Sequence, residues 1–162
     1  MSAEHMYGDA HAVASRGATI AFVEPDSPAD DAGLEPGDVV VTADGELIRD
    51  VLDWQWAASD FEVALTVRAP NGTLHDITLE RDAEEGFGIG FDDVVFDGVR
   101  ECDNACLFCF VSQLPPGLRD ALYVRDDDYR LSFLYGNFVT LTNLTEDDVD
   151  RIAAQRLSPL YV

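Results

Sequence analysis

The sequence contains no lysine, and its ten arginines stand against 32 acidic residues, which gives a formal net charge of -22. A field of this sign repels the phosphates of nucleic acids and the headgroups of anionic membranes. We therefore expect neither nucleic acid nor a membrane among the partners. The acidity is typical of a hydrated surface in a salty cytoplasm or of a genome rich in Ala, Asp and Arg. It does not indicate an activity.

The sequence also lacks any apolar run of the roughly 18 residues that a membrane-spanning helix needs. Its first 16 residues have neither the basic start nor the apolar core of a secretory signal. Residues 1–14 contain His5 and His11, and we expect them to form a disordered tail with solvated histidines. These absences predict a soluble, cytoplasmic protein.

Cysteine is absent except in one short stretch, where Cys102, Cys106 and Cys109 have the spacing C-x3-C-x2-C. An odd number of cysteines does not fit a closed set of disulfides, and a reducing compartment suits them better. Packing does not require three thiols in one loop, whereas a tight loop can direct several thiolates at one metal centre. The stretch is therefore a candidate metal or cluster site.

Residues 15–82 have the pattern of a small α+β domain with two helices. Strands are expected at residues 19–23, 39–41, 61–68 and 74–80. The last two strands are joined by a hairpin turn at Asn71-Gly72. One short helix begins after Ser27, which is a good N-cap, and a second helix is expected at residues 50–58. We expect both tryptophans of the second helix to lie in the core.

This order of elements resembles a bacterial PDZ domain, a small β-barrel or sandwich with two helices. The resemblance is carried by Ser-Pro-Ala at residues 27–29, Ala-Gly-Leu at 32–34, Pro-Gly-Asp at 36–38 and Asp-Gly at 44–45. PDZ domains bind a peptide C-terminus by strand addition beside a glycine-rich loop. Here that loop is expected just before Ile20, at residues 15–18, which do not have the usual sequence. The resemblance implies a peptide partner or an intramolecular docking role.

Residues 83–92 are expected to link this domain to the next. The alternating glycines at residues 86–90 do not have the spacing of a dinucleotide-binding loop, and no Lys-Ser/Thr pair follows them. We interpret them as a flexible approach to the next strand.

Residues 93–162 alternate between strand and helix patterns, which favours parallel β/α units. Strands are expected at residues 93–97, 138–142 and 160–162, and helices at residues 118–124 and after Thr145. Thr145 and Asp148 have the spacing of a capping box, and Val149, Ile152, Ala153 and Leu157 form an apolar stripe on the helix that follows. The three aspartates at residues 126–128 are interpreted as a solvated turn, because consecutive carboxylates cannot all face one cation.

The residues of the cysteine stretch leave four interpretations open. They are buried core thiols, a structural zinc site, a redox disulfide between Cys106 and Cys109, and an iron–sulfur cluster. Zinc sites normally have four ligands, and the nearest candidate, His75, lies in the other domain. The disulfide leaves Cys102 unused. A four-iron cube held by three cysteines, with one iron open to a small molecule, uses all three thiols.

The same spacing, with Phe108 just before the last cysteine, resembles the radical S-adenosylmethionine (radical SAM) enzymes. The resemblance implies that Cys102, Cys106 and Cys109 ligate a [4Fe-4S] cluster whose open iron binds S-adenosylmethionine. Reductive cleavage of that cofactor yields a 5′-deoxyadenosyl radical in the family. Phe108 matches the aromatic residue that contacts the adenine side of the cofactor.

The second strand of the family's partial, TIM-like β/α barrel commonly ends in a Gly-Gly-Glu motif that holds the cofactor's amino group. Thr142 and Asn143 stand at that place here and depart from the motif. The resemblance makes them candidate contacts of S-adenosylmethionine. It also implies an electron donor such as ferredoxin or flavodoxin, and it leaves the substrate open.

A narrower resemblance follows from the whole order of motifs. The PDZ-like part, followed by CDNACLFCF at residues 102–110, DDDYRLSF at 126–133 and LSPLYV at 157–162, resembles a bacterial group of radical SAM iron–sulfur oxidoreductases with a further C-terminal domain. A six-unit half-barrel takes on the order of 200 residues. We therefore expect an N-terminal fragment that is too short to be active alone. The alternative is a PDZ-type peptide-binding module with a non-catalytic iron–sulfur or zinc loop.

Overall fold

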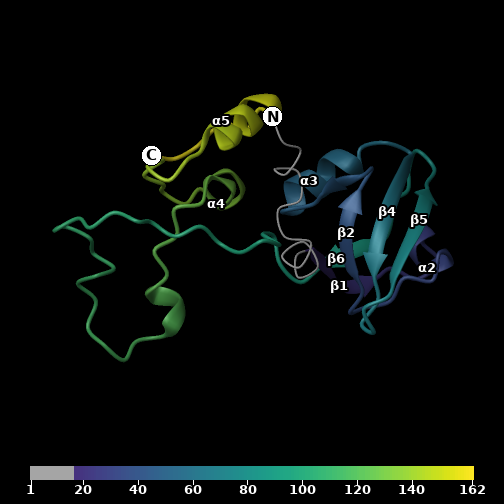
Figure 1. Ribbon diagram of the computed structural model, residues 1–162, viewed down its shortest axis with the longest axis horizontal. Coiled ribbons are helices and arrows are strands. Elements are labelled where there is room, and N and C mark those ends of the chain that lie inside the picture. The colour runs from purple at the N-terminus through teal and green to yellow at the C-terminus, as the bar shows by residue number, and fades with distance from the viewer. Residues whose placement is uncertain (1–16) are drawn as a thin grey trace, which may run out of the picture. The chain divides into compact units, whose positions relative to one another are not determined.

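The computed structural model describes residues 17–162, so the tail expected at residues 1–14 lies outside the described part of the chain. The chain divides into two compact units, of which the first ends at Asp97 and the second spans Gly98–Val162. Figure 1 shows the first unit as a sheet with short helices and the second as a long loop with helices. No helix within residues 17–162 is long and apolar enough to cross a bilayer.

The first unit is an open antiparallel sheet with the strand order β5-β4-β2-β1-β6, and β3 pairs with β2 beside this path. Its strands are β1 (Ala18–Val23), β2 (Val39–Ala43), β3 (Glu46–Leu47), β4 (Glu62–Arg68), β5 (Leu74–Glu80) and β6 (Ile89–Phe91). The predicted hairpin is confirmed, because β4 and β5 pair along their full length around Gly72, whose φ is +86°. An open sheet with few helices fits the expected PDZ-like fold.

Two short helices accompany the sheet; the cap predicted at Ser27 is confirmed, and Asp50, expected inside the second helix, is its N-cap. In α2 (Pro28–Asp31) the Ser27 hydroxyl accepts a hydrogen bond from the Asp30 amide at 3.3 Å. In α3 (Val51–Ala57) the Asp50 carboxylate accepts from the Leu52 amide at 3.0 Å and from the next amide at 3.2 Å. These bonds satisfy amides that have no partner inside the helix.

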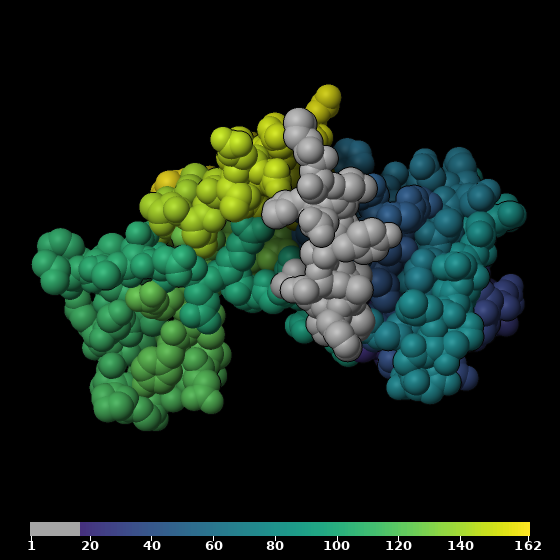
Figure 2. All heavy atoms as spheres, in the orientation of Figure 1, coloured from purple at the N-terminus to yellow at the C-terminus, as the bar shows by residue number. Residues whose placement is uncertain are grey.

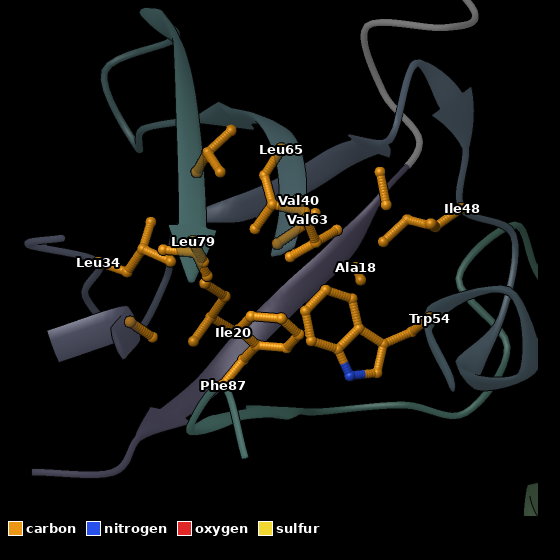
Figure 3. Close-up of a cluster of buried hydrophobic side chains, with 13 residues drawn as sticks. Ala18, Ile20, Leu34, Val40, Ile48, Trp54, Val63, Leu65, Leu79 and Phe87 are labelled. Carbon is orange, nitrogen blue, oxygen red and sulfur yellow. The ribbon is translucent and has the colours of Figure 1, made fainter. Parts of the chain in front are cut away.

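The core of the first unit lies where Trp54 of α3 meets Phe87 and the side chains of β1 (Figure 3). The Trp54 ring packs edge-on against Phe87 at 6.1 Å and against Phe91 at 5.4 Å between ring centroids. Trp54 is 8% exposed, but Trp56 is 54% exposed. The expectation of a buried Trp56 is wrong, because residues two apart in a helix point in nearly opposite directions.

Residues 83–92 were expected to be a linker, but much of this segment belongs to the first unit. Phe87 is 4% exposed within the core. Next to it, β6 pairs antiparallel with β1, with Ile20 opposite Phe91 and Val23 opposite Ile89. Residues 83–92 thus provide a strand of the first unit, although the PDZ-like domain was expected to end at residue 82.

The alternating glycines of this segment allow close packing. A Cβ atom on Gly88 would lie 2.1 Å from the Ser27 hydroxyl oxygen, and one on Gly90 would lie 2.0 Å from the Phe22 ring. Gly88 also has a φ of +77°, which a side chain would strain. Close contact with Phe22 of β1 and with the N-cap of α2 therefore explains Gly88 and Gly90 without a phosphate ligand.

Residues 93–97 do not form the expected buried strand. Val95 makes only an isolated antiparallel bridge with Asp50. On either side of it, the Val51 amide donates to the Val94 carbonyl at 2.9 Å, and the Phe96 amide donates to the Arg49 carbonyl at 2.7 Å. These bonds attach the chain to the start of α3, so the boundary between the units falls after Asp97.

The second unit contains η1 (Asp120–Leu122), α4 (Tyr129–Tyr135) and α5 (Glu146–Ala154), and no regular strand within the described residues. The strands expected at residues 138–142 and 160–162 are reduced to one parallel bridge between Phe138 and Tyr161. Parallel strands are normally covered on both faces. Phe138 and Val162 are instead 77% and 74% exposed. The expected β/α barrel units are therefore not formed here.

Helix α5 buries polar side chains rather than the apolar stripe that its sequence predicts. The capping box at the start of α5 is confirmed, with Thr145 and Asp148 bonding each other's amides. The expected apolar stripe is not buried as a whole, since Val149 is 53% exposed. Asp148 and Arg151 are the buried side chains of α5. Helix α4 was not predicted, and the helix expected at residues 118–124 is a single 3-10 turn.

Candidate cluster-binding site

The three cysteines lie between β6 and η1, in a segment that Figure 1 draws as a long irregular loop. The atoms of this part of the chain are teal to green in Figure 2. All three thiols are free; Cys106 is exposed, and Cys102 and Cys109 are partly buried. A turn bond joins the Cys109 amide to the Cys106 carbonyl at 3.2 Å. Within residues 17–162, no three His, Cys, Asp or Glu side chains are gathered as metal ligands. Ligation by these thiols stays a prediction.

Large apolar side chains around the cysteines point into solvent. Leu107 is 90% exposed, Phe108 is 89% exposed and Phe110 is 76% exposed. Aromatic rings are seldom left so open, because burying such a ring stabilises a protein by roughly 1.5–3 kcal/mol. The ring of Phe108, a predicted cofactor contact, is thus available to a planar ligand.

Arg125 holds the first part of the loop, and no local sequence pattern indicates this role. Its guanidinium donates to the carbonyl of Cys102 and, at 3.3 Å, to the carbonyl of Asn104. In return, the Cys102 amide donates to the Arg125 carbonyl at 2.7 Å. A fixed positive charge therefore stands beside the segment between the first two cysteines.

The pKa of the Cys109 thiol lies below its ordinary value. The main cause is a hydrogen bond from the Ser112 side chain, and the backbone amides of Ser112 and Val111 act in the same direction. The charge of Arg125 adds a smaller contribution. Hydrogen bonds and positive charge favour the thiolate, which is the form that ligates a metal.

The predicted cofactor contacts Thr142 and Asn143 lie against the cysteine loop, although they are far from it in sequence. The amide nitrogen of Asn104 donates to the Thr142 hydroxyl at 2.7 Å. The amide nitrogen of Asn143 donates to the Glu101 carbonyl at 3.3 Å and to the Asp127 carbonyl at 3.2 Å. The structure thus brings the expected strand end and the loop together.

Asn143 also carries a buried acceptor without a partner. Its Oδ1 atom makes no hydrogen bond among the described residues. The two carbonyls that face Nδ2 fix the orientation of the amide, so the unpaired atom is the oxygen. Leaving a buried acceptor unpaired costs about 1–3 kcal/mol. A donor group that reached this atom would remove that cost.

The aspartates at residues 126–128 are not a solvated turn, and that expectation is wrong. Asp127 is 2% exposed and Asp128 is 0% exposed. Each carboxylate has its own partners. Asp126 accepts from Asn137 at 2.8 Å, and Asp127 accepts from the amide and the hydroxyl of Thr140 at 2.5 and 2.7 Å. Burial is tolerated because each group is hydrogen-bonded.

A buried ionic network fixes the chain just before the first cysteine. Arg100 pairs with Asp148 of α5, with Nη1 2.5 Å from Oδ2. This bond is the main cause that raises the pKa of Arg100. Burial raises the pKa of Asp148, but the bonds from Arg100 and Thr145 outweigh it, so the pKa lies well below its usual range. The chain therefore enters the cysteine loop from a fixed point.

Tyr129 lies beside this network. Its ring faces the guanidinium of Arg100 at 5.5 Å, and its hydroxyl accepts a hydrogen bond from Arg151 at 2.9 Å. Burial raises the pKa of Tyr129 above its ordinary value, although Arg151 lowers it in part. The phenol therefore stays neutral and links α4 to α5.

Family profiles match both parts of the chain. The radical SAM-like domain profile matches residues 81–162, and the PDZ domain profile matches residues 19–81. The first match covers half of the sequence and includes all three cysteines. The chain belongs to the radical SAM-like domain family and carries a PDZ domain before that domain. The profiles meet at Arg81, whereas the compact units meet after Asp97.

Solved structures similar to the chain are PDZ domains. The PDZ domain of an SdrC-like protein from Listeria monocytogenes is 20% identical to this chain, with a TM-score of 0.42. The alignment covers 48% of this chain and 88% of the Listeria domain. The corresponding domain from Listeria innocua is 21% identical with a TM-score of 0.40, and covers 47% and 93%. Identity this low concerns the fold alone. No curated protein matches the chain.

Proposed function

We propose that this chain binds a [4Fe-4S] cluster through Cys102, Cys106 and Cys109, and S-adenosylmethionine beside it. The observation that carries the proposal is the match of the radical SAM-like profile over the segment that holds all three cysteines. The donor set fits such a cluster, because three thiolates leave one iron for a further ligand and the chain has no fourth cysteine. When bound, the cluster supplies an electron that cleaves S-adenosylmethionine.

Other residues of the site support binding and orientation. Ser112 and Arg125 favour the thiolate of Cys109. The unpaired oxygen of Asn143 is an acceptor suited to an amino group such as that of S-adenosylmethionine. The exposed ring of Phe108 offers a face for adenine. Under this proposal the protein works in the cytoplasm, where thiols stay reduced, and takes its electron from a ferredoxin or flavodoxin.

Anaerobic reconstitution of the full chain with iron and sulfide tests the proposal. We expect a brown protein with about four irons per chain, whose reduced EPR signal changes when S-adenosylmethionine is added. Replacement of all three cysteines by alanine should abolish iron uptake, whereas His75→Ala, in strand β5 of the first unit, should not. Equal iron in the triple variant would contradict the proposal.

The PDZ domain supports a second function, the capture of a peptide C-terminus. The carboxylate-binding loop is expected at residues 15–18, just before Ile20, and strand β1, which follows it, pairs with β2 on one side and with β6 on the other. The outer edge of β6 pairs with no strand among the described residues. A pocket of about 410 Å³ adjoins this edge, with Phe22, Trp54 and Ile89 among its walls. An open edge beside a pocket is the arrangement that strand addition requires.

A library of peptide C-termini, screened against the full chain, tests this function. Each binder is compared with the same peptide carrying a C-terminal amide. We expect binding to fall at least tenfold on amidation and to survive replacement of the three cysteines. No binder in the library, or equal binding of acid and amide, would contradict peptide capture and leave the cluster proposal untouched.

A further inference from the structure

A chain of hydrogen bonds runs from the cysteine loop to a buried carboxylate. The amide nitrogen of Asn104 lies 2.7 Å from the hydroxyl of Thr142, which lies 2.7 Å from the hydroxyl of Thr140. The Thr140 hydroxyl in turn lies 2.7 Å from Oδ2 of Asp127. Asp127 is 2% exposed, while Thr142 and Asn104 lie at the surface of the unit. Two ordinary threonine side chains thus connect the core to the loop.

The two ends of this chain allow only one direction of donation. A carboxylate accepts and cannot donate, so the Thr140 proton points to Asp127. The contact between the two threonines then needs the proton of Thr142. The oxygen of Thr142 is left to accept from Asn104, whose amide nitrogen can only donate. Every proton along the chain therefore points toward Asp127.

Within the cysteine loop, the chain of hydrogen bonds ends at the side chain of Asn104. It lies two positions after Cys102 and two before Cys106. Its carbonyl accepts from Arg125, so the backbone and the side chain of Asn104 are held from two sides. The Asp127 carbonyl also accepts from Asn143, which ties the same point of the core to the other predicted cofactor contact.

We propose that Asp127 is a positioning residue of the cluster loop. Through Thr140 and Thr142 it fixes the side chain of Asn104, and with it the span between the first two cysteines. Asp127 acts without contacting cluster or cofactor. This inference rests on the proposed function, because the buried aspartate would order the cysteine ligands before iron binds.

Asp127→Ala removes the acceptor of both bonds that anchor Thr140, the one from its amide and the one from its hydroxyl. Asp127→Asn can still hold Thr140, because its oxygen accepts from the Thr140 amide and its nitrogen donates to the Thr140 hydroxyl oxygen. The Thr140 proton then turns to Thr142, whose oxygen has two lone pairs and accepts from both Thr140 and Asn104. Asp127→Asn should therefore keep the bond to the loop that Asp127→Ala weakens.

Hydrogen–deuterium exchange of residues 101–110 in the iron-free full chain measures how firmly these hydrogen bonds hold the cysteine loop. We expect exchange about two- to tenfold faster in Asp127→Ala and Thr142→Val, the range for the loss of one hydrogen bond, and exchange near the wild-type rate in Asp127→Asn. Thr142→Ser, which keeps the hydroxyl, should exchange at the wild-type rate. Asp126→Asn is the matched control, because its partner Asn137 lies outside the chain of bonds.

Iron uptake and EPR give the second readout. After reconstitution, Thr142→Val should hold less iron and show a smaller effect of S-adenosylmethionine than Thr142→Ser, at an unchanged unfolding midpoint, and Asp127→Ala should hold less iron than Asp127→Asn. Equal exchange in Thr142→Val and Thr142→Ser would overturn the positioning role. If the wild-type chain takes up no iron, the proposed function fails, but the exchange ranking still decides the role of Asp127.

Discussion

Asp128 and Arg130 form an ion pair inside the second unit, with Nη2 2.7 Å from Oδ2 and side chains 0% and 1% exposed. Asp128 also caps α4 by accepting from the Arg130 amide at 3.0 Å, and it accepts from the Arg100 amide at 3.1 Å. The guanidinium of Arg130 reaches the Gly98 carbonyl at 3.1 Å. One carboxylate therefore joins the first residues of the unit to the first turn of its helix.

Asp128→Asn should destabilise the second unit by about 3–5 kcal/mol, because it breaks the buried ion pair with the guanidinium of Arg130. Urea unfolding followed by far-ultraviolet circular dichroism measures the loss. Both tryptophans lie in the first unit, so the tryptophan fluorescence transition should stay where it is. Asp126→Asn, in a partly exposed carboxylate with an amide partner, should cost less than about 1 kcal/mol. Equal losses in the two variants would contradict the prediction.

Lowering the pH should reduce the stability of the second unit, because Asp148 becomes protonated. Bonds from Arg100 and Thr145 keep the folded-state pKa of Asp148 below that of the unfolded chain, despite the opposing effect of burial. A depressed pKa contributes stability that is complete above the unfolded value of about 3.9 and is lost as the pH falls toward the folded value. The free energy of unfolding should therefore fall below about pH 4. In Asp148→Asn this fall should be smaller and the stability at pH 7 lower; an identical acid profile would count against the assignment.

Gly88→Ala should destabilise the first unit by about 2–4 kcal/mol, from the strain of a positive φ together with overpacking against Ser27. Gly86→Ala is the matched control, because the nearest atom to its added Cβ lies 3.9 Å away. That variant should stay within about 0.5 kcal/mol of the wild type. Tryptophan fluorescence during urea unfolding reports both. A neutral Gly88→Ala would mean that β6 does not pack here as described.

The two tryptophans of α3 should differ sharply when each is replaced by alanine. Trp54→Ala should cost about 3–5 kcal/mol, as for other buried aromatic residues. Trp56→Ala should cost less than about 1 kcal/mol, because the side chain is mostly in solvent. Each variant keeps the other tryptophan as its fluorescent reporter. Similar losses in both would restore the sequence-based expectation that both are buried.

Features with strong local signals could be predicted from the sequence. The Asn71-Gly72 hairpin, the Ser27 cap and the Thr145 capping box depend on residues within a few positions of one another. The cysteine loop stands out for a similar reason, since its spacing is local. The family profile confirms the kind of domain that this spacing and the neighbouring motifs indicated.

Features that depend on distant partners were missed. The burial of Asp127 depends on Thr140, and the hold on the loop depends on Arg125, neither of which is marked by nearby sequence. The pairing of β6 with β1 joins segments at opposite ends of the first unit. A glycine-rich strand also has too few side chains for an alternating pattern to indicate it.

The strand β6 has a practical consequence for anyone who divides this chain. A piece that stops at residue 81, where the match to the PDZ profile ends, would lose Phe87 and leave unpaired the edge of β1 that β6 covers. Unpaired strand edges can pair with neighbouring molecules, so we expect that piece to aggregate in solution. A piece that continues to Asp97 keeps its own protective strand. The residues that begin the radical SAM-like match thus also cover the edge of β1 in the PDZ domain.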